Sequence, residues 1–141
     1  MMKTLVVVPC YNESQRLKQS EFLQYVQEHP DVDFLFANDG SRDNTLDMLQ
    51  SLCQQHPQLH FLDLQPNGGK AEAVRRGMLH AAEAFEAEYI MFLDADLATP
   101  LFEIERFVEW ADRGYEVVMG LRLMRLGAQV RRKTLRHYLG R

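Results

Sequence analysis

The 141-residue sequence has no apolar run near the roughly 18–20 residues that a membrane helix needs. Its first eleven residues lack the long apolar core and the small-residue cleavage site of a signal peptide, and they lead directly into a predicted strand. The only two cysteines, Cys10 and Cys53, have neither metal-ligand nor redox spacing, so we expect free thiols in a reducing compartment. These absences predict a cytoplasmic protein, and the length predicts one domain.

Three motifs of common nucleotide-binding and hydrolytic enzymes are also missing. No Gly-x-Gly-x-x-Gly follows the first predicted strand, which disfavours a dinucleotide-binding protein. The stretch Gly68-Gly69-Lys70 is followed by Ala71 instead of Ser or Thr, so it is not a Walker loop. A Ser–His–Asp hydrolase would need a Gly-x-Ser-x-Gly elbow, and the sequence has none.

The net charge of −4 hides a strong asymmetry along the chain. Seven of the 16 basic residues lie in residues 121–141, which contain no acidic residue. Residues 1–120 therefore carry nine basic against 20 acidic residues, a formal charge of −11 beside a tail of +7. We expect residues 1–120 to form an α/β domain and the basic C-terminal segment 121–141 to bind phosphates, on a ligand or on a membrane surface.

Strand and helix patterns alternate throughout the sequence. Strands are predicted over residues 4–8, 32–37, 59–64, 89–93 and 116–119. Helices are predicted over residues 14–28, 45–55, 70–85 and 100–113, the last with Thr99 as N-cap and Pro100 in its first turn. This order predicts a doubly wound, mainly parallel sheet with helices on both faces.

Unusual polar clusters follow four of the predicted strands, at residues 12–13, 38–41, 67–70 and 94–96. Ligands of doubly wound sheets bind outside the carboxyl ends of the strands. Four polar clusters on one edge of the sheet therefore predict a binding site there.

Asp94 and Asp96 end the apolar run 89–93 and are the most informative pair in the sequence. Side chains at i and i+2 of a strand leave on the same side, so the two carboxylates are expected to face one point. Like charges so placed favour a cation, and hard oxygen ligands suit Mg²⁺ or Mn²⁺ completed by substrate phosphates and water. The alternative is that both residues serve only as turn and cap residues after the strand.

Four motifs in order resemble the inverting family 2 glycosyltransferases of GT-A fold. They are Val8-Pro9-Cys10-Tyr11-Asn12-Glu13, residues 38–45 (Asn-Asp-Gly-Ser-Arg-Asp-Asn-Thr), residues 67–78 (Asn-Gly-Gly-Lys-Ala-Glu-Ala-Val-Arg-Arg-Gly-Met) and residues 94–100 (Asp-Ala-Asp-Leu-Ala-Thr-Pro). Their order and spacing match over nearly the whole chain. The third motif is most similar to the branch that glycosylates dolichyl or undecaprenyl phosphate.

The resemblance implies roles for single residues. Pro9, Tyr11 and Glu13 would border the nucleotide base and ribose, and Asp39 would accept a hydrogen bond from a base N–H. Asp94 would touch the ribose or the metal, Asp96 would bind the metal on the diphosphate, and Lys70 would contact phosphate. Arg122 and Arg131 or Arg132 would meet phosphates on the acceptor side. Some relatives supply a further metal ligand two residues after the second aspartate, where Ala98 has no oxygen to offer.

Several of these residues have a plainer alternative. Tyr11 could pack over the edge of the sheet, and Asp39 could cap its own turn, where Asx residues are favoured. Gly68 and Gly69 could serve a tight strand–helix turn. Lys70 could be a solvated helix start.

The implied activity is transfer of a hexose from a nucleoside-diphosphate sugar to a polyprenyl phosphate, with inversion and metal assistance. The resemblance favours a UDP-hexose over GDP-mannose. An acceptor phosphate is already anionic and needs no base, in keeping with Glu116 as the only carboxylate after Asp112. We expect this chain to be the donor-binding portion of such an enzyme, at the cytoplasmic face of a membrane.

Two alternatives remain open at this point. The chain could be a non-catalytic nucleotide-sugar-binding module, or a family 2 transferase that acts on a saccharide hydroxyl. A nucleic-acid-binding role is disfavoured by the acidic body and by the lack of aromatics interleaved with the basic residues.

Overall fold

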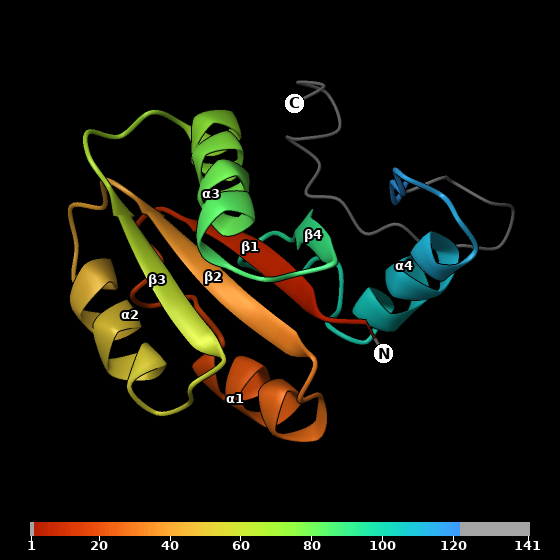
Figure 1. Ribbon diagram of the computed structural model, residues 1–141. Coiled ribbons are helices and arrows are strands. Elements are labelled where there is room, and N and C mark those ends of the chain that lie inside the picture. The colour runs from red at the N-terminus through yellow and green to blue at the C-terminus, as the bar shows by residue number, and fades with distance from the viewer. Residues whose placement is uncertain (1, 122–141) are drawn as a thin grey trace, which may run out of the picture.

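The structure is a computed structural model that describes residues 2–121. Four strands alternate with four helices (Figure 1). The elements are β1 (Thr4–Cys10), α1 (Gln19–Glu28), β2 (Val32–Asp39), α2 (Thr45–Cys53), β3 (Leu59–Leu64), α3 (Lys70–Ala84), β4 (Tyr89–Phe92) and α4 (Glu103–Asp112). The predicted alternation of strands and helices is therefore confirmed for these eight elements.

All strand pairs in the sheet are parallel, and the strand order is β3-β2-β1-β4. Thr4 of β1 is in register with Val32 of β2 on one side and with Tyr89 of β4 on the other. The first three strands thus lie side by side in chain order, and the chain then crosses over so that β4 pairs with the other edge of β1. This reversal confirms the predicted doubly wound sheet.

The central strands are apolar on both sides because helices cover both faces of the sheet. Val6, Val8, Phe34 and Phe36 pack in one cluster with side chains of α1, α2 and α4. Alternate residues of the same strands, such as Leu5 and Val7, pack on the opposite face with Ala73 and Ala81 of α3. Figure 1 shows α3 on one side of the sheet and α1 and α2 on the other.

Two contacts set how closely the helices approach their neighbours. Gly77 of α3 lies against β1 so closely that a Cβ there would be 2.6 Å from Cγ1 of Val7. On the other face, Nε2 of His29, just after α1, is 2.8 Å from Oε1 of Glu105 in α4. These contacts attach α3 to the middle of the sheet and α4 to the end of α1.

β1 continues two residues beyond the predicted end at Val8, through Pro9. The pairing of β1 with β4 ends at Val7↔Phe92, so Pro9 has a strand neighbour only on the β2 side, opposite Ala37. A proline is tolerated where its nitrogen need not pair with a strand. Beyond this point β1 and β4 no longer pair, and this is where the strand order reverses, the usual ligand position in such sheets.

Two predicted helix starts are wrong. The helix predicted from residue 14 begins at Gln19, because residues 14–17 form a turn in which the amides of Arg16 and Leu17 donate to the carbonyl of Glu13. The helix predicted from Thr99 and Pro100 begins at Glu103, after a turn in which the Glu103 amide donates to the carbonyl of Pro100. Thr99 is therefore not its N-cap. The predicted stop at Gly114 is confirmed by its φ of 93° and its bond to the carbonyl of Ala111.

The strand predicted over residues 116–119 is also wrong, since residues 117–121 have no regular secondary structure. Val117 is 76% exposed and Met119 is 80% exposed, so neither gains the packing that decides strand formation in a short β-prone segment. No helix within residues 2–121 is both long and apolar enough to cross a membrane. Except for Leu121, the predicted basic segment 121–141 lies outside the described residues.

Candidate functional site

Asp39 ends β2 and joins it to the loop before α3. Its Oδ1 accepts a hydrogen bond from the Gly68 amide at 2.8 Å, and its Oδ2 accepts from the Gly69 amide at 2.9 Å. The side-chain amide of Asn67 donates to Oδ2 at 3.1 Å and to the Asp39 carbonyl at 2.8 Å. Asp39 is only 4% exposed, so a buried carboxylate holds the 67–69 loop in place.

The two residues that flank Asp39, Asn38 and Gly40, strengthen this link. Gly40 has a φ of 60°, and a Cβ there would lie 2.5 Å from the Asn67 backbone nitrogen, so only glycine fits without displacing the loop. Asn38 is fully buried, donates to Oδ1 of Asp63 in β3 at 2.8 Å and accepts from the Ser41 hydroxyl at 2.5 Å. The ends of β2 and β3 therefore form one hydrogen-bonded unit.

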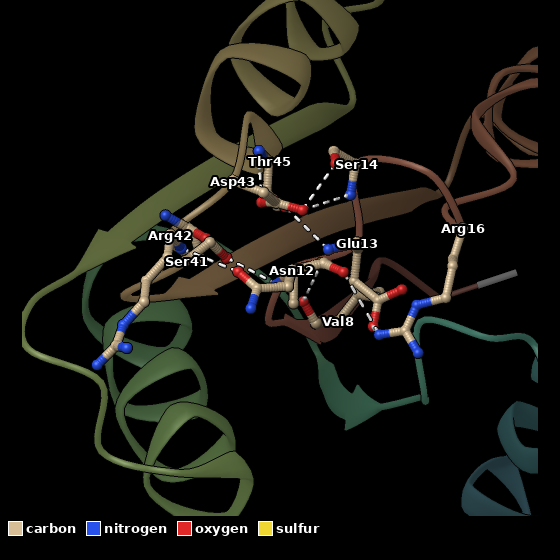
Figure 2. A network of polar contacts seen from close by, with 11 residues as sticks. Val8, Asn12, Glu13, Ser14, Arg16, Ser41, Arg42, Asp43 and Thr45 are labelled. Atoms are coloured by element: carbon tan, nitrogen blue, oxygen red, sulfur yellow. Dashed lines mark hydrogen bonds and ion pairs between the residues drawn. The ribbon is translucent and has the colours of Figure 1, made fainter.

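The loop after β1 is attached to the same unit (Figure 2). The Asn12 amide donates to Oγ of Ser41 at 3.0 Å, and Oδ1 of Asn12 accepts from the Arg42 amide at 2.9 Å. Asn12 has a φ of 51°, a left-handed conformation that asparagine tolerates better than most residues. The Asn12 backbone and side chain thus reach across to two consecutive residues of the β2–α2 loop.

Asp43 completes this network at the start of α2. It accepts hydrogen bonds from both the amide and the hydroxyl of Thr45, and from the Ser14 hydroxyl at 2.7 Å. Desolvation raises the pKa of Asp43, but the hydrogen bonds from Thr45 and Ser14 outweigh it and lower the pKa to about 2. The Thr45 hydroxyl in turn accepts from the Glu13 amide at 2.8 Å. We call residues 9–18, 38–45 and 63–70 together the interlocked rim.

Asp94 and Asp96 lie in a turn just after β4, on the other side of β1. Burial alternates along this turn, since Leu93, Ala95 and Leu97 are buried whereas the two aspartates are not. Leu97 has a φ of 53°, and its amide donates to the Asp94 carbonyl at 3.1 Å. The three buried side chains anchor the turn, and both carboxylates are left on its accessible side.

The two aspartates have different partners. Oδ1 of Asp96 accepts from the Ala98 amide at 2.9 Å, which is the capping role that the plainer alternative predicts. Oδ1 of Asp94 is 2.5 Å from Nζ of Lys70, the first residue of α3. This ion pair connects the turn after β4 to the interlocked rim.

Glu13 places a third carboxylate near this turn. Burial raises its pKa, the charge of Arg16 opposes this rise, and the negative charges of Asp96 and Asp43 add to it. The Arg16 guanidinium lies 3.0 Å from Oε1 of Glu13. The effect of Asp96 on Glu13 indicates that the turn after β4 and the loop after β1 share one electrostatic environment.

A divalent cation would find only part of its ligands here. Within residues 2–121, no group of three or more histidine, cysteine, aspartate or glutamate side chains is arranged to hold a metal ion. Asp94 and Asp96 offer the hard oxygen ligands that Mg²⁺ and Mn²⁺ prefer, and Asp94 already binds the cationic ammonium of Lys70. These two residues therefore fit a metal that takes its remaining ligands from phosphates and water.

The structure brings most of the predicted site residues to this edge of the sheet. Asp39 and Lys70 belong to the interlocked rim; Pro9 is half-buried in β1, and Tyr11 is 41% exposed directly after it. Arg122, Arg131 and Arg132 lie outside the described residues. No role for Asn38, Ser41, Asp43 and Asn67 was predicted from the sequence, although the density of polar residues in these two strand-end turns is a signal of such a network.

Comparison with known proteins points to one family. The sequence profile described as Glycosyl transferase family 2 matches residues 5–140. A dolichyl-phosphate beta-glucosyltransferase of Trichomonas vaginalis is 34% identical over 97% of this chain and 44% of its own length. A poly-beta-1,6-N-acetyl-D-glucosamine synthase of Staphylococcus epidermidis is 34% identical over 72% of this chain and 24% of its own length.

A solved structure supports the fold. The mannosyltransferase of Pyrobaculum calidifontis in complex with GDP-Man and Mn²⁺ superposes with a TM-score of 0.61, at 23% identity, over 77% of this chain and 32% of that one. The chain thus spans less than half the length of each of these relatives. Because the family profile covers nearly every residue, the chain belongs to glycosyl transferase family 2.

Proposed function

We propose that this chain binds a nucleoside-diphosphate sugar at the interlocked rim and serves as the donor-binding part of an inverting glycosyltransferase. The observation that carries the proposal is the attachment of three strand-end loops to one another beside a turn with two accessible carboxylates. Such a site is preorganised for one part of a ligand and open for the other. A nucleotide with a charged diphosphate has these two parts.

The base and ribose are proposed to bind beside Pro9, Tyr11 and Glu13, where β1 no longer pairs with β4. Asp39 has two roles in this proposal. Its carboxylate has about four acceptor sites, and three are used by Asn67, Gly68 and Gly69. The remaining acceptor is available for the base N–H contact that the family resemblance implies.

The diphosphate is proposed to bind between Lys70 and the turn with Asp94 and Asp96. Mg²⁺ or Mn²⁺ at these carboxylates would act as a Lewis acid on the departing diphosphate. The residues of the chain orient this group through the ammonium of Lys70. Arg122, Arg131 and Arg132, outside the described residues, are proposed to meet phosphates on the acceptor side.

A polyprenyl phosphate is the proposed acceptor, and UDP-hexose is preferred over GDP-mannose as donor. The similarity to a dolichyl-phosphate beta-glucosyltransferase supports this acceptor. An ionised phosphate needs no general base, and Glu116 is the only carboxylate among residues 113–141. In this proposal the protein acts at the cytoplasmic face of a membrane, with its basic segment on anionic lipid.

A second candidate is transfer to a saccharide hydroxyl, which the similarity to a poly-beta-1,6-N-acetyl-D-glucosamine synthase favours. A radiolabelled-donor assay with the full chain distinguishes the two acceptors. Label that moves into undecaprenyl or dolichyl phosphate supports the first, and label that moves only into oligosaccharide supports the second. Donor binding without transfer to either would assign the chain as a nucleotide-sugar-binding module.

Donor binding itself is tested by thermal unfolding with UDP, GDP, UDP-glucose and GDP-mannose, each with and without Mn²⁺. A ligand at about 100 times its dissociation constant should stabilise the fold by about 2.7 kcal/mol. We expect Asp96→Ala to remove the part of this stabilisation that depends on Mn²⁺ and to leave the unliganded fold intact, since Asp96 is exposed. The exposed helix residue Glu109 provides the control Glu109→Ala. No stabilisation by any of the four nucleotides would contradict the proposal.

A further inference from the structure

Lys70 occupies a position between two kinds of negative charge. Its ammonium is 2.5 Å from Oδ1 of Asp94, and it stands at the first position of α3. Asp96, two residues further along the turn, makes no salt bridge within residues 2–121. Within residues 2–121, Lys70 is therefore the cation that pairs with this acidic turn.

The Lys70–Asp94 pair can be broken at low energetic cost. The Lys70 side chain is 60% exposed and that of Asp94 is 40% exposed. Ion pairs at such exposed positions contribute little because water and salt screen them. A divalent cation that binds Asp94 and Asp96 would therefore displace the ammonium readily.

The backbone of Lys70, in contrast, is held in place. The two preceding residues, Gly68 and Gly69, donate their amides to the buried carboxylate of Asp39. Only the flexible four-carbon side chain has to move when the ammonium changes partners. The ammonium can therefore change partners while its backbone stays attached to the interlocked rim.

We infer that Lys70 is an exchangeable cation, which pairs with Asp94 before ligand binds and transfers to the diphosphate when a divalent metal replaces it. The inference rests on the proposed function and adds to it that the metal binds together with the diphosphate and not before it. Lys70 opposes binding of the metal alone, because both compete for Asp94. It favours binding of the metal together with a diphosphate, because the displaced ammonium then pairs with phosphate oxygen. The site thus discriminates against a bare metal ion.

The test is Mn²⁺ binding to Lys70→Met, measured as loss of the free Mn²⁺ signal in electron paramagnetic resonance. Without nucleotide, we expect the variant to bind Mn²⁺ up to about fivefold more tightly than the parent, the range of an exposed ion pair. With saturating UDP, we expect it to bind Mn²⁺ about tenfold more weakly, because a charge-assisted contact to the diphosphate is lost. The opposite signs of the two effects are the signature of exchange.

Two controls test whether the effects come from a cation at position 70 and not from a change in the net charge of the protein. Lys70→Arg keeps a cation and should show neither effect at full size. Arg106→Gln removes a cation from an exposed pair with Glu103 on α4, outside the interlocked rim, and should leave both affinities unchanged. Folding of each variant is verified by its melting temperature.

Two results would overturn the exchange. Unchanged or weaker Mn²⁺ binding by Lys70→Met without UDP would show that Lys70 does not compete with the metal. The same conclusion follows if neither protein binds Mn²⁺ without UDP but both bind it with UDP, and the proposed donor site would then stand. Absence of Mn²⁺ binding in every condition, together with no stabilisation by nucleotides, would remove the donor site as well.

Discussion

The interlocked rim and the β4 side of the molecule (residues 89–121) are built in opposite ways. Polar groups of the rim are buried and joined to other loops, as Asn38 and Asp39 are. The β4 side instead leaves apolar groups exposed, including Phe92 at 49%, Val117 at 76% and Met119 at 80%. A cavity of about 610 Å³ lies between β4, α4 and residues 115–121.

This difference indicates which part of the site the chain completes by itself. The rim holds its loops through its own hydrogen bonds, so its shape does not depend on a ligand. Among the residues that the structure describes, the exposed pair of Lys70 and Asp94 is the polar connection between the β4 side and the rim. The substitutions below test this contrast, from the largest expected effect to the smallest.

Among the substitutions in the rim and on the β4 side, replacing Asp39 with alanine should have the largest effect. The amides of Gly68 and Gly69 would lose their acceptor next to a buried position, and each unsatisfied group costs about 1–3 kcal/mol. We expect a loss of about 2–4 kcal/mol in the free energy of unfolding, measured by urea denaturation. The exposed Asp47→Ala is the control. A loss below about 1 kcal/mol would mean that the rim is not held through Asp39.

Gly40→Ala should destabilise the protein by about 2 kcal/mol. The left-handed φ of 60° costs a residue with a Cβ about 1–2 kcal/mol, and contact with the Asn67 backbone adds to that cost. Gly114→Ala is a matched control, because its φ is 93° but a Cβ there would meet nothing within 4 Å. Equal losses in both variants, by thermal unfolding, would show that strain alone acts and that the two loops are not in tight contact.

Asp43 should make the stability of the folded protein depend on pH in the acidic range. Because its pKa is lowered from 3.8 to about 2 in the folded protein, it contributes stability above pH 4 that is lost as the pH falls toward 2. We expect Asp43→Asn to unfold at a lower temperature than the parent at pH 6, and the two melting temperatures to converge near pH 2. The side chain is exposed, so the effect stays below about 1 kcal/mol. A difference that does not vary with pH would contradict this assignment.

Met119→Ser should have the smallest effect, within about 0.5 kcal/mol. Its side chain is 80% exposed and buries little against the fold. Leu49→Ser, in contrast, replaces a fully buried side chain of the core and should unfold the protein at a much lower temperature. A large loss for Met119→Ser would show that residues 115–121 pack as firmly as the rim.

The sequence was informative where periodicity and turn residues act locally. Four strands, their helices and the clustering of polar residues at one edge were predicted, because apolar runs between glycine- and asparagine-rich turns determine them. The predicted helix start at residue 14 failed because Ser14 bonds to Asp43, 29 residues away. The role of Asp39 in holding Gly68 and Gly69 could not be derived for the same reason, since such pairings appear only when the loops meet in three dimensions.

The hydrogen bonds that Asp39 accepts from the 67–69 loop restrict how this protein can diverge. A residue inserted after β2 or after β3 would shift one partner of a contact that also includes the close approach of Gly40 to Asn67. These two loops can therefore change by substitution but hardly by length. Within residues 2–121, the stretch 98–102, which carries the exposed Phe102, makes no hydrogen bond to another strand-end loop, and insertions would be better tolerated there. Differences in length are accordingly expected on the β4 side, while the rim keeps its dimensions.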